Sequence, residues 1–218
     1  MIDAAMIFAA GFGTRMGALT RETPKPMLPV LGRPMIDYAI DLLKDAGVPR
    51  LVANTHYLAD RIEPHLARQG VITCREDPIL ETGGGLRAAL PRLAGDPVFT
   101  INPDAIWRGP NPATALAKAW RDEMQALLML VPSPDGLETD DFSLEKGEIG
   151  RSGPYRYTGL QILRTGRLHE IPDDVFSLNR YWDLLAATGP VHGIVYSGDW
   201  IDIGRPEGLA EAERLLRA

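Results

Sequence analysis

Residues 9–30 read "AAGFGTRMGALTRETPKPMLPV" and follow directly on an apolar run at the start of the chain. Gly11 and Gly13 allow the backbone to approach a ligand closely and to turn its N–H groups toward it. The stretch is not a Walker loop, because the string G-x-x-x-x-G-K-[ST] does not occur. A dinucleotide-binding loop would need glycine where Met16 stands, and a helix where the prolines exclude one. We therefore predict a different kind of ligand-binding loop, which leaves the first strand.

The same stretch carries cations that suit phosphate groups. Arg15 offers a planar guanidinium that matches phosphate oxygens, and Thr14 beside it offers a hydroxyl. Lys25 stands between Pro24 and Pro26. Because the two rings fix φ on either side, the lysine loses less entropy when its ammonium binds an anion. Glycines and cations together predict a site for a phosphate-bearing ligand.

The composition is that of a globular protein, with 218 residues, 45% hydrophobic and 24% charged. Its net charge of −6 argues against binding of nucleic acid through the phosphates. A lone cysteine, Cys74, cannot form an internal disulfide, and the N-terminus lacks the cationic start of a secretory signal. No apolar run approaches the roughly 18 residues that span a bilayer. We expect a cytoplasmic protein of one domain, residues 1–218, with neither nucleic acid nor membrane as a partner.

Strand-like apolar runs alternate with helical patterns along most of the chain. Residues 4–10 predict a strand, residues 34–47 a helix and residues 50–54 the next strand. The alternation predicts a Rossmann-like α/β fold, with a mostly parallel sheet flanked by helices. In such sheets ligands bind beyond the carboxyl ends of the strands. Residues 132–157 break the alternation, and their glycines, prolines and acids predict a small antiparallel insertion.

Polar side chains follow two of the predicted strands. Asn102 ends the predicted strand "PVFTIN" and Asp104 lies just past it, and Asp202 lies in "SGDWIDIGRPEGL" near the C-terminus. Mg²⁺ in nucleotide sites is held by one or two carboxylates together with phosphate oxygens, and Asp104 is well placed for that role. Asp199 is expected on the other side of the strand or in its turn. Each aspartate could instead be a turn or helix-cap residue.

The pattern GxGTRM…TxxxPKPMLPVxGRPMI, which spans residues 11–36, resembles the signature of the sugar-1-phosphate nucleotidyltransferases. Among these, the short chain and the string "ETGGGL" are most similar to bacterial N-acetylmuramate-1-phosphate uridylyltransferases and short mannose-1-phosphate guanylyltransferase-like proteins. The resemblance implies the nucleotide-diphospho-sugar transferase fold and Mg²⁺ as cofactor. It also implies a reaction in which an NTP and a sugar 1-phosphate give an NDP-sugar and pyrophosphate.

The resemblance further implies roles for individual residues. Asp104 and Asp202 are the metal pair, and together with Arg15 and Lys25 they form the catalytic group. Contacts to the nucleotide are expected from Ala10, Gly11, Gly13, Thr14, Arg15, Lys25, Glu81, Thr82, Gly83 and Gly84. Contacts on the sugar-phosphate side are expected from Asn102, Asp141 and Gly159.

The glycines of "ETGGGL" open a predicted helix, where bare backbone can lie flat against a ligand and donate N–H groups. The alternative is a tight turn in which Thr82 caps the helix. Two positions depart from the family pattern. Pro103 stands where relatives often have Gly or Ser, and Lys146 lacks the following proline of a Glu-Lys-Pro string. We therefore assign Lys146 no role and leave Arg151 and Arg156 as open candidates for the sugar phosphate.

The resemblance favours UTP and N-acetylmuramate 1-phosphate as substrates, which would place the protein in the recycling of cell-wall peptidoglycan. Alternatives are a mannose- or glucose-1-phosphate nucleotidyltransferase, a phosphocholine-type cytidylyltransferase and a nucleotide-sensing module without chemistry. The sequence leaves the oligomeric state open.

Overall fold

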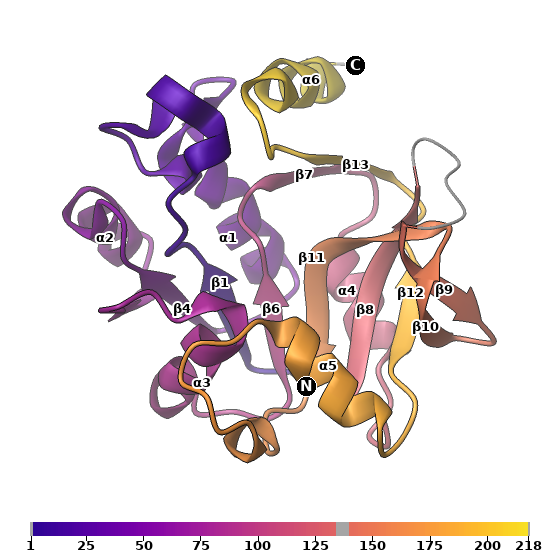
Figure 1. The fold of residues 1–218 in the computed structure, drawn as a ribbon. Coiled ribbons are helices and arrows are strands. Elements are labelled where there is room, and N and C mark those ends of the chain that lie inside the picture. Colours follow the sequence, from indigo (N-terminus) through magenta and orange to yellow (C-terminus); the bar gives the residue numbers. More distant parts are fainter. Residues whose placement is uncertain (1, 134–139, 218) are drawn as a thin grey trace.

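A nine-stranded sheet forms the centre of the computed structural model, which describes residues 2–133 and 140–217 (Figure 1). In their order across the sheet the strands are β5 (Ile72–Arg75), β4 (Arg50–Thr55), β1 (Ala4–Phe8), β6 (Val98–Ile101), β11 (Tyr155–Leu163), β8 (Ala126–Pro132), β12 (His192–Val195), β10 (Glu148–Gly153) and β9 (Asp140–Glu145).

The first half of the sheet is parallel, and the second half is mixed. Strands β5, β4, β1 and β6 run parallel to one another, as the alternation of strands and helices predicts. Strand β11 then runs antiparallel to both β6 and β8, whereas β12 is parallel to β8. The expected antiparallel insertion is the hairpin of β9 and β10, which leads into β11; residues 134–139 lie outside the described part. A tight turn is enough to join two antiparallel neighbours, so the chain from β9 through β10 to β11 needs no crossover helix.

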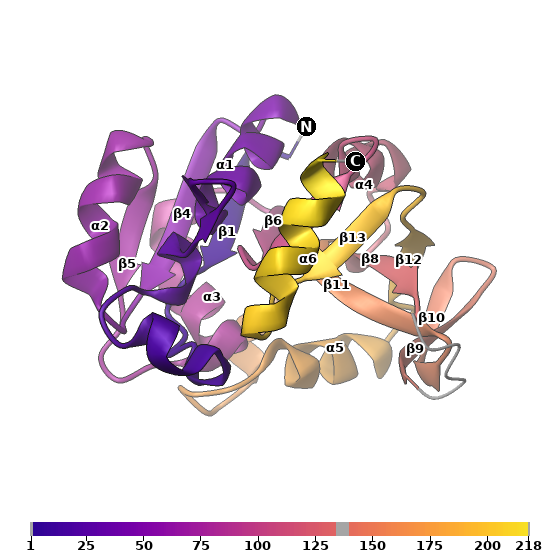
Figure 2. The same cartoon turned by 90° about the horizontal axis from the view of Figure 1, so that it is seen from above.

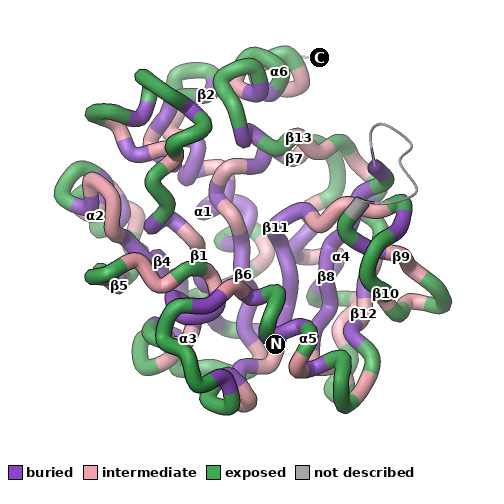
Figure 3. Tube along the Cα trace, viewed as in Figure 1, coloured by how far each residue is buried: buried purple, intermediate pink, exposed green. Residues whose placement is uncertain are grey.

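The far edge of the sheet curls back on itself. Strand β9 pairs with β10 and also with β11, where Tyr155 lies opposite Phe142. Figure 3 shows β8 and β11 buried along most of their length, whereas the β9–β10 hairpin is largely exposed. The curl brings the hairpin beside the start of β11, so that side chains of the two can share one cavity.

Within the described residues, five α-helices cover the two faces of the sheet (Figure 2), and a sixth lies beyond one end of the strands (Figure 1). The packing follows the alternation of side chains along β1, whose Ala5 and Ile7 face one core and whose Ala4 and Met6 face the other. The first core includes residues of α1 (Met35–Asp45), α2 (Ala59–Arg68) and α4 (Pro112–Ala119), and the second those of α3 (Glu81–Leu93) and α5 (Leu178–Ala186). None of the described helices is long and apolar enough to cross a membrane.

A third, smaller core joins the N-terminal loop to the C-terminal part of the chain. Met16, Ile106 and Ile203 are at most 1% exposed, and burial of each contributes about 1.5–3 kcal/mol. The elements that meet there are η1 (Thr14–Thr20), β2 (Pro29–Val30), the start of α1, β7 (Ala105–Arg108), β13 (Asp199–Asp202) and α6 (Pro206–Arg217). The short elements η2 (Lys25–Met27) and β3 (Arg33–Pro34) flank β2 in the chain. The short helix η3 (Leu168–Glu170) lies outside this core. This packing holds three segments that are distant in sequence at one end of β1 and β6.

Candidate active site

Three adjoining cavities form a continuous cleft at the carboxyl ends of β1 and β6, and Phe8 lines all three. The glycine-loop cavity, about 360 Å³, lies against residues 11–16 and includes Lys25 and Asp104. The Asn54 cavity, about 220 Å³, shares Asp104 with it and extends to Glu81. The Trp182 cavity, about 260 Å³, continues from Thr82 and Asn102 toward the β9–β10 hairpin. The cleft thus lies where the parallel sheet predicts a ligand.

Lys25 and Asp104 meet in the glycine-loop cavity. The lysine Nζ lies 2.6 Å from Asp104 Oδ2, and the two side chains are only 12% and 23% exposed. Lys25 begins η2, directly after Pro24 with its φ of −60°. A Cβ atom on Gly13 would lie 2.8 Å from the Cβ of Lys25, so only glycine admits the lysine at this distance. The glycine therefore makes room for the cation that the prolines hold in place.

Asp202 approaches the same point from the C-terminal segment. It lies opposite Ala105 in the β7–β13 pair, and the amide of Ile203 donates to the carbonyl of Asp104 at 2.7 Å. Burial and the nearby charge of Asp104 raise the pKa of Asp202, while Lys25, Arg15 and Arg156 act in the opposite direction. Asp199, at the other end of β13, instead pairs with Arg108 at 2.8 Å. The two aspartates expected to act together thus lie close enough for their charges to interact.

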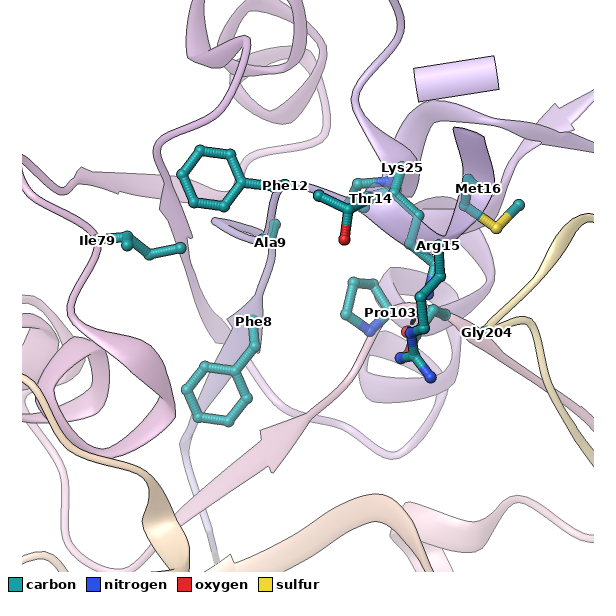
Figure 4. A pocket seen from close by; sticks show the side chains of 14 residues that line it. Phe8, Ala9, Phe12, Thr14, Arg15, Met16, Lys25, Ile79, Pro103 and Gly204 are labelled. Atoms are coloured by element: carbon teal, nitrogen blue, oxygen red, sulfur yellow. Dashed lines mark hydrogen bonds and ion pairs between the residues drawn. The ribbon is translucent and has the colours of Figure 1, made fainter. Parts of the chain in front are cut away.

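Arg15 lies on the same side of the cavity. Figure 4 shows its guanidinium reaching toward Pro103 and Gly204, whereas Phe12 and Ile79 lie together on the other side. A Cβ atom on Gly204 would lie 2.8 Å from Asp202 Oδ2 and 3.3 Å from an Arg15 Nη1, so the three groups are packed against one another. The remaining cations of the N-terminal segment do not line the cleft; Arg33, for instance, pairs with Asp41. Of the cations expected to bind phosphate, Arg15 and Lys25 therefore lie together in the glycine-loop cavity.

The raised pKa of Asp202 leads to a prediction for stability. A carboxyl group whose pKa is higher in the folded state binds its proton more tightly there, so its favourable contribution is lost as pH rises through the folded pKa. We expect Asp202→Asn to raise the free energy of unfolding at neutral pH in metal-free buffer, and to have little effect near pH 3.9, where aspartate protonates. Denaturant unfolding at the two pH values measures the difference. A variant that is less stable than wild type at neutral pH would contradict this prediction.

The glycines of "ETGGGL" differ from what the sequence predicts. They lie inside α3, which begins at Glu81, and the amides of Gly83 and Gly84 donate to the carbonyl of Phe176 at 2.8 and 3.1 Å. These two amides therefore face the segment before α5, and neither glycine lines the cleft. Thr82 does not cap the helix, because its hydroxyl accepts from the amide of Leu178 at 2.9 Å. Glu81 and Thr82 do line the Asn54 cavity.

Close packing explains why these positions are glycines. A Cβ atom on Gly84 would lie 2.2 Å from the backbone oxygen of Asp174, which cannot move without displacing its segment. We expect Gly84→Ala to lower the free energy of unfolding by about 1–3 kcal/mol or more, as overpacking does. Gly166→Ala is the matched control, since nothing lies within 4 Å of a Cβ atom there. Denaturant unfolding of both variants tests the prediction, and equal stabilities would contradict it.

Of the residues expected on the sugar-phosphate side, Asn102 and Asp141 line the Trp182 cavity, but Gly159 does not. Gly159 has a φ of +86°, accepts a hydrogen bond from the amide of Asn102 at 3.0 Å, and would bring a Cβ atom within 2.8 Å of that side chain. Gly159 therefore holds Asn102 in position and does not itself line the cavity. Asp141 Oδ2 accepts from the amide of Tyr157 at 2.9 Å, which joins the hairpin to β11.

A buried polar network beneath the Asn54 cavity is not predicted from the sequence. Asn54 Nδ2 donates to Glu76 Oε1 at 2.7 Å, and Asn54 Oδ1 accepts from the amide of Ala9 at 2.8 Å. The other oxygen of Glu76 accepts from the amide of Leu80 at 2.9 Å. This network fixes the backbone on both sides of the cavity. The rule that ligands bind beyond the carboxyl ends of strands, which pointed to Asp104, could also have pointed to these two residues. Asn54 lies at the carboxyl end of β4, and Glu76 directly follows β5.

Comparisons with known proteins identify the family of the chain. Residues 5–139 match the MobA-like NTP transferase domain family. The chain is 38% identical to an N-acetylmuramate alpha-1-phosphate uridylyltransferase of Caulobacter vibrioides, over 97% of this chain and 96% of the relative. A protein of the same name from Neisseria meningitidis serogroup B is 33% identical over 98% of both chains.

Among solved structures, HddC from Yersinia pseudotuberculosis complexed with GMP-PN superimposes with a TM-score of 0.80 and 25% identity, over 99% of this chain and 100% of the other. The fold is therefore that of the nucleotide-diphospho-sugar transferases. The chain belongs to the MobA-like NTP transferase family, and it is a sugar-1-phosphate nucleotidyltransferase.

Proposed function

We propose that this enzyme transfers the uridylyl group of UTP to N-acetylmuramate 1-phosphate, giving UDP-N-acetylmuramate and pyrophosphate. The choice of substrates is supported by the names of the two bacterial relatives, which match the chain over nearly its whole length. The observation that carries the proposed chemistry is the convergence of Arg15, Lys25 and Asp104 in one cavity, with the charge of Asp202 directly beside them. Such a product belongs to the recycling of cell-wall peptidoglycan, which supports a cytoplasmic location.

In the proposed reaction, an oxygen of the sugar phosphate forms a bond to the α-phosphorus of UTP. The bond from that phosphorus to the bridging oxygen of pyrophosphate breaks, and the leaving group takes the electron pair. The attacking phosphate is already an anion at neutral pH, so no side chain needs to remove a proton. The main obstacle is repulsion between two anions, together with charge that grows on the leaving group. Arg15 and Lys25 oppose both effects by positioning the phosphates and stabilising their charge.

The residues at this site fit a divalent cation, for which we propose Mg²⁺. Asp104 and Asp202 are close enough that the charge of one raises the pKa of the other, and a cation between them would relieve that repulsion. The described residues include no cluster of three or more acidic, histidine or cysteine side chains that could hold a metal by themselves. Two carboxylates completed by phosphate oxygens and water are a usual arrangement for Mg²⁺. When bound, the ion would neutralise phosphate charge and orient the triphosphate.

The cleft suggests how the substrates divide among the cavities. We assign the triphosphate to the glycine-loop cavity, where Gly11, Gly13, Thr14, Arg15 and Lys25 line the wall. The nucleoside is assigned to the Asn54 cavity, which is lined by Ala10, Glu81 and Thr82 among others. The sugar is assigned to the Trp182 cavity, beside Asn102 and Asp141.

The experiment that tests the proposed function is a matrix of the four NTPs against several phosphorylated acceptors, read as release of pyrophosphate. The acceptors are the 1-phosphates of N-acetylmuramate, N-acetylglucosamine, mannose and glucose, together with phosphocholine. We expect the highest kcat/KM with UTP and N-acetylmuramate 1-phosphate. A preference for GTP and mannose 1-phosphate, or for CTP and phosphocholine, would replace this assignment with one of the alternatives. Nucleotide binding without any release of pyrophosphate would identify a sensing module.

A further inference from the structure

Arg151 forms part of the wall of the Trp182 cavity, which Lys25 does not line. It comes from β10, and its guanidinium lies over the rings of Phe142 and Trp182, with Cζ 5.2 and 5.6 Å from their centroids. The two rings help to hold the guanidinium in place, because a cation is attracted to an aromatic face. The cavity therefore presents a cation at a defined position, although the net charge of the chain is negative.

The polar contacts of Arg151 leave part of it available. Nε and Nη2 donate to Asp183 Oδ1 at 3.2 and 2.7 Å, and Nη1 and Nη2 donate to the side chain and backbone oxygens of Asn179 at 2.9 and 3.1 Å. A guanidinium has five N–H groups, so these contacts leave one on Nη1. The side chain of Arg151 is 46% exposed, and Asp183, which does not line the cavity, is 65% exposed. A ligand in the cavity can thus reach the cation without displacing its carboxylate partner.

The groups around the Arg151 guanidinium are suited to binding a small anion. Ser177 and Asn179, which line the same wall, carry a hydroxyl and an amide that can donate to an oxygen. Helix α5 begins at this wall, and its first turn adds positive potential. The opposing charge is Asp141, whose Oδ2 is already bonded to the amide of Tyr157. The chemistry of the wall is therefore that of a carboxylate-binding site within the proposed sugar cavity.

We propose that Arg151 determines specificity for sugar 1-phosphates that carry a carboxylate, by binding that carboxylate in the Trp182 cavity. The inference rests on the proposed function, because it assigns the sugar to this cavity. N-acetylmuramate differs from N-acetylglucosamine by a lactyl ether that ends in a carboxylate. Arg151 then distinguishes the two sugars through a charged hydrogen bond that the neutral sugar cannot make.

The test compares N-acetylmuramate 1-phosphate with its lactyl carboxamide, which has nearly the same size but no charge. We expect the wild-type enzyme to favour the acid in kcat/KM by about 10–100-fold, as hydrogen bonds to charged groups do, mostly through KM. Arg151→Met should remove most of this preference, and Arg151→Lys should restore part of it. Arg180→Met is the matched control, because Arg180 lies on α5, pairs with Asp173, has a similarly exposed side chain and does not line the cavity.

A second variant separates specificity from a merely structural role. Arg151 also fastens the β9–β10 hairpin to α5 through Asp183, and Asp183→Asn weakens that connection while it leaves the guanidinium in place. We expect Asp183→Asn to keep or increase the preference for the acid. If Arg151→Met and Asp183→Asn instead lower turnover of acid and amide equally, Arg151 acts only in packing, and the inference is wrong.

The remaining outcomes distinguish this inference from the proposed function. If the wild-type enzyme turns over acid and amide at equal rates, nucleotidyl transfer stands, but the cavity does not detect the carboxylate. If it turns over no N-acetylhexosamine 1-phosphate, the proposed function fails, and the inference fails with it. Pyrophosphate release with each sugar, measured under the same conditions, separates these results.

Discussion

Lys25→Met is expected to lower kcat/KM by about 10²–10³, because loss of one preorganised electrostatic contact in an enclosed site has an effect of that size. Lys25 is largely buried at 2.6 Å from Asp104, in the cavity that we assign to the triphosphate. Methionine keeps most of the length and apolar volume of lysine, so the packing beside Gly13 is retained while the charge is lost. Steady-state measurement of pyrophosphate release gives the result.

Lys118→Met is the control for this variant, because Lys118 is an exposed lysine on α4, away from the cleft. It should leave kcat/KM unchanged. A denaturant unfolding curve for Lys25→Met shows whether the fold survives loss of the ion pair. If the folded variant turns over at nearly the wild-type rate, Lys25 has no catalytic role.

Asp104→Asn is expected to reduce kcat/KM by at least about 100-fold, and to move half-maximal activation to a higher Mg²⁺ concentration. The amide keeps the shape of the carboxylate but carries no charge, so it holds a divalent cation less tightly. It also leaves Lys25 without its 2.6 Å partner in the metal-free enzyme. Titration of activity with Mg²⁺, together with direct measurement of Mn²⁺ binding in the presence of nucleotide, checks both parts of the prediction.

Asp199→Asn is the matched control, because Asp199 lies on the same short sheet but pairs with Arg108 outside the cleft. It should change neither turnover nor the Mg²⁺ requirement. An Asp104→Asn enzyme that remains fully active with an unchanged Mg²⁺ dependence would remove Asp104 from the metal site. The proposed reaction would then need another ligand for the cation.

Stability and function oppose each other in this cavity. Two carboxylates lie within reach of each other's charge, and burial makes ionisation of Asp202 less favourable. Removing the charge of Asp202 is expected to relieve this repulsion while it lowers activity. Such a combination is typical of active sites, where a locally unfavourable arrangement of charge is retained because the chemistry needs it.

The sequence by itself determined the local features of this enzyme. The order of apolar runs predicted strands β1, β4 and β6 in their observed places, because each residue pattern reports directly on the period of its own backbone. The glycine loop and the prolines around Lys25 predicted the cation site in the same way, since φ restrictions act within a few residues. The rule that ligands lie beyond strand ends then selected Asp104.

Only the tertiary structure decided which distant groups meet. Asp202 reaches Asp104 because β13 pairs with β7, a contact across almost a hundred residues that no local pattern encodes. Gly83 and Gly84 looked like ligand-binding backbone, yet their amides serve the segment before α5, since a glycine accommodates protein and ligand equally well. Arg151 became part of the cleft only because the hairpin curls back against β11 and α5. Periodicity and turn chemistry are local, whereas convergence of charge depends on how the elements pack.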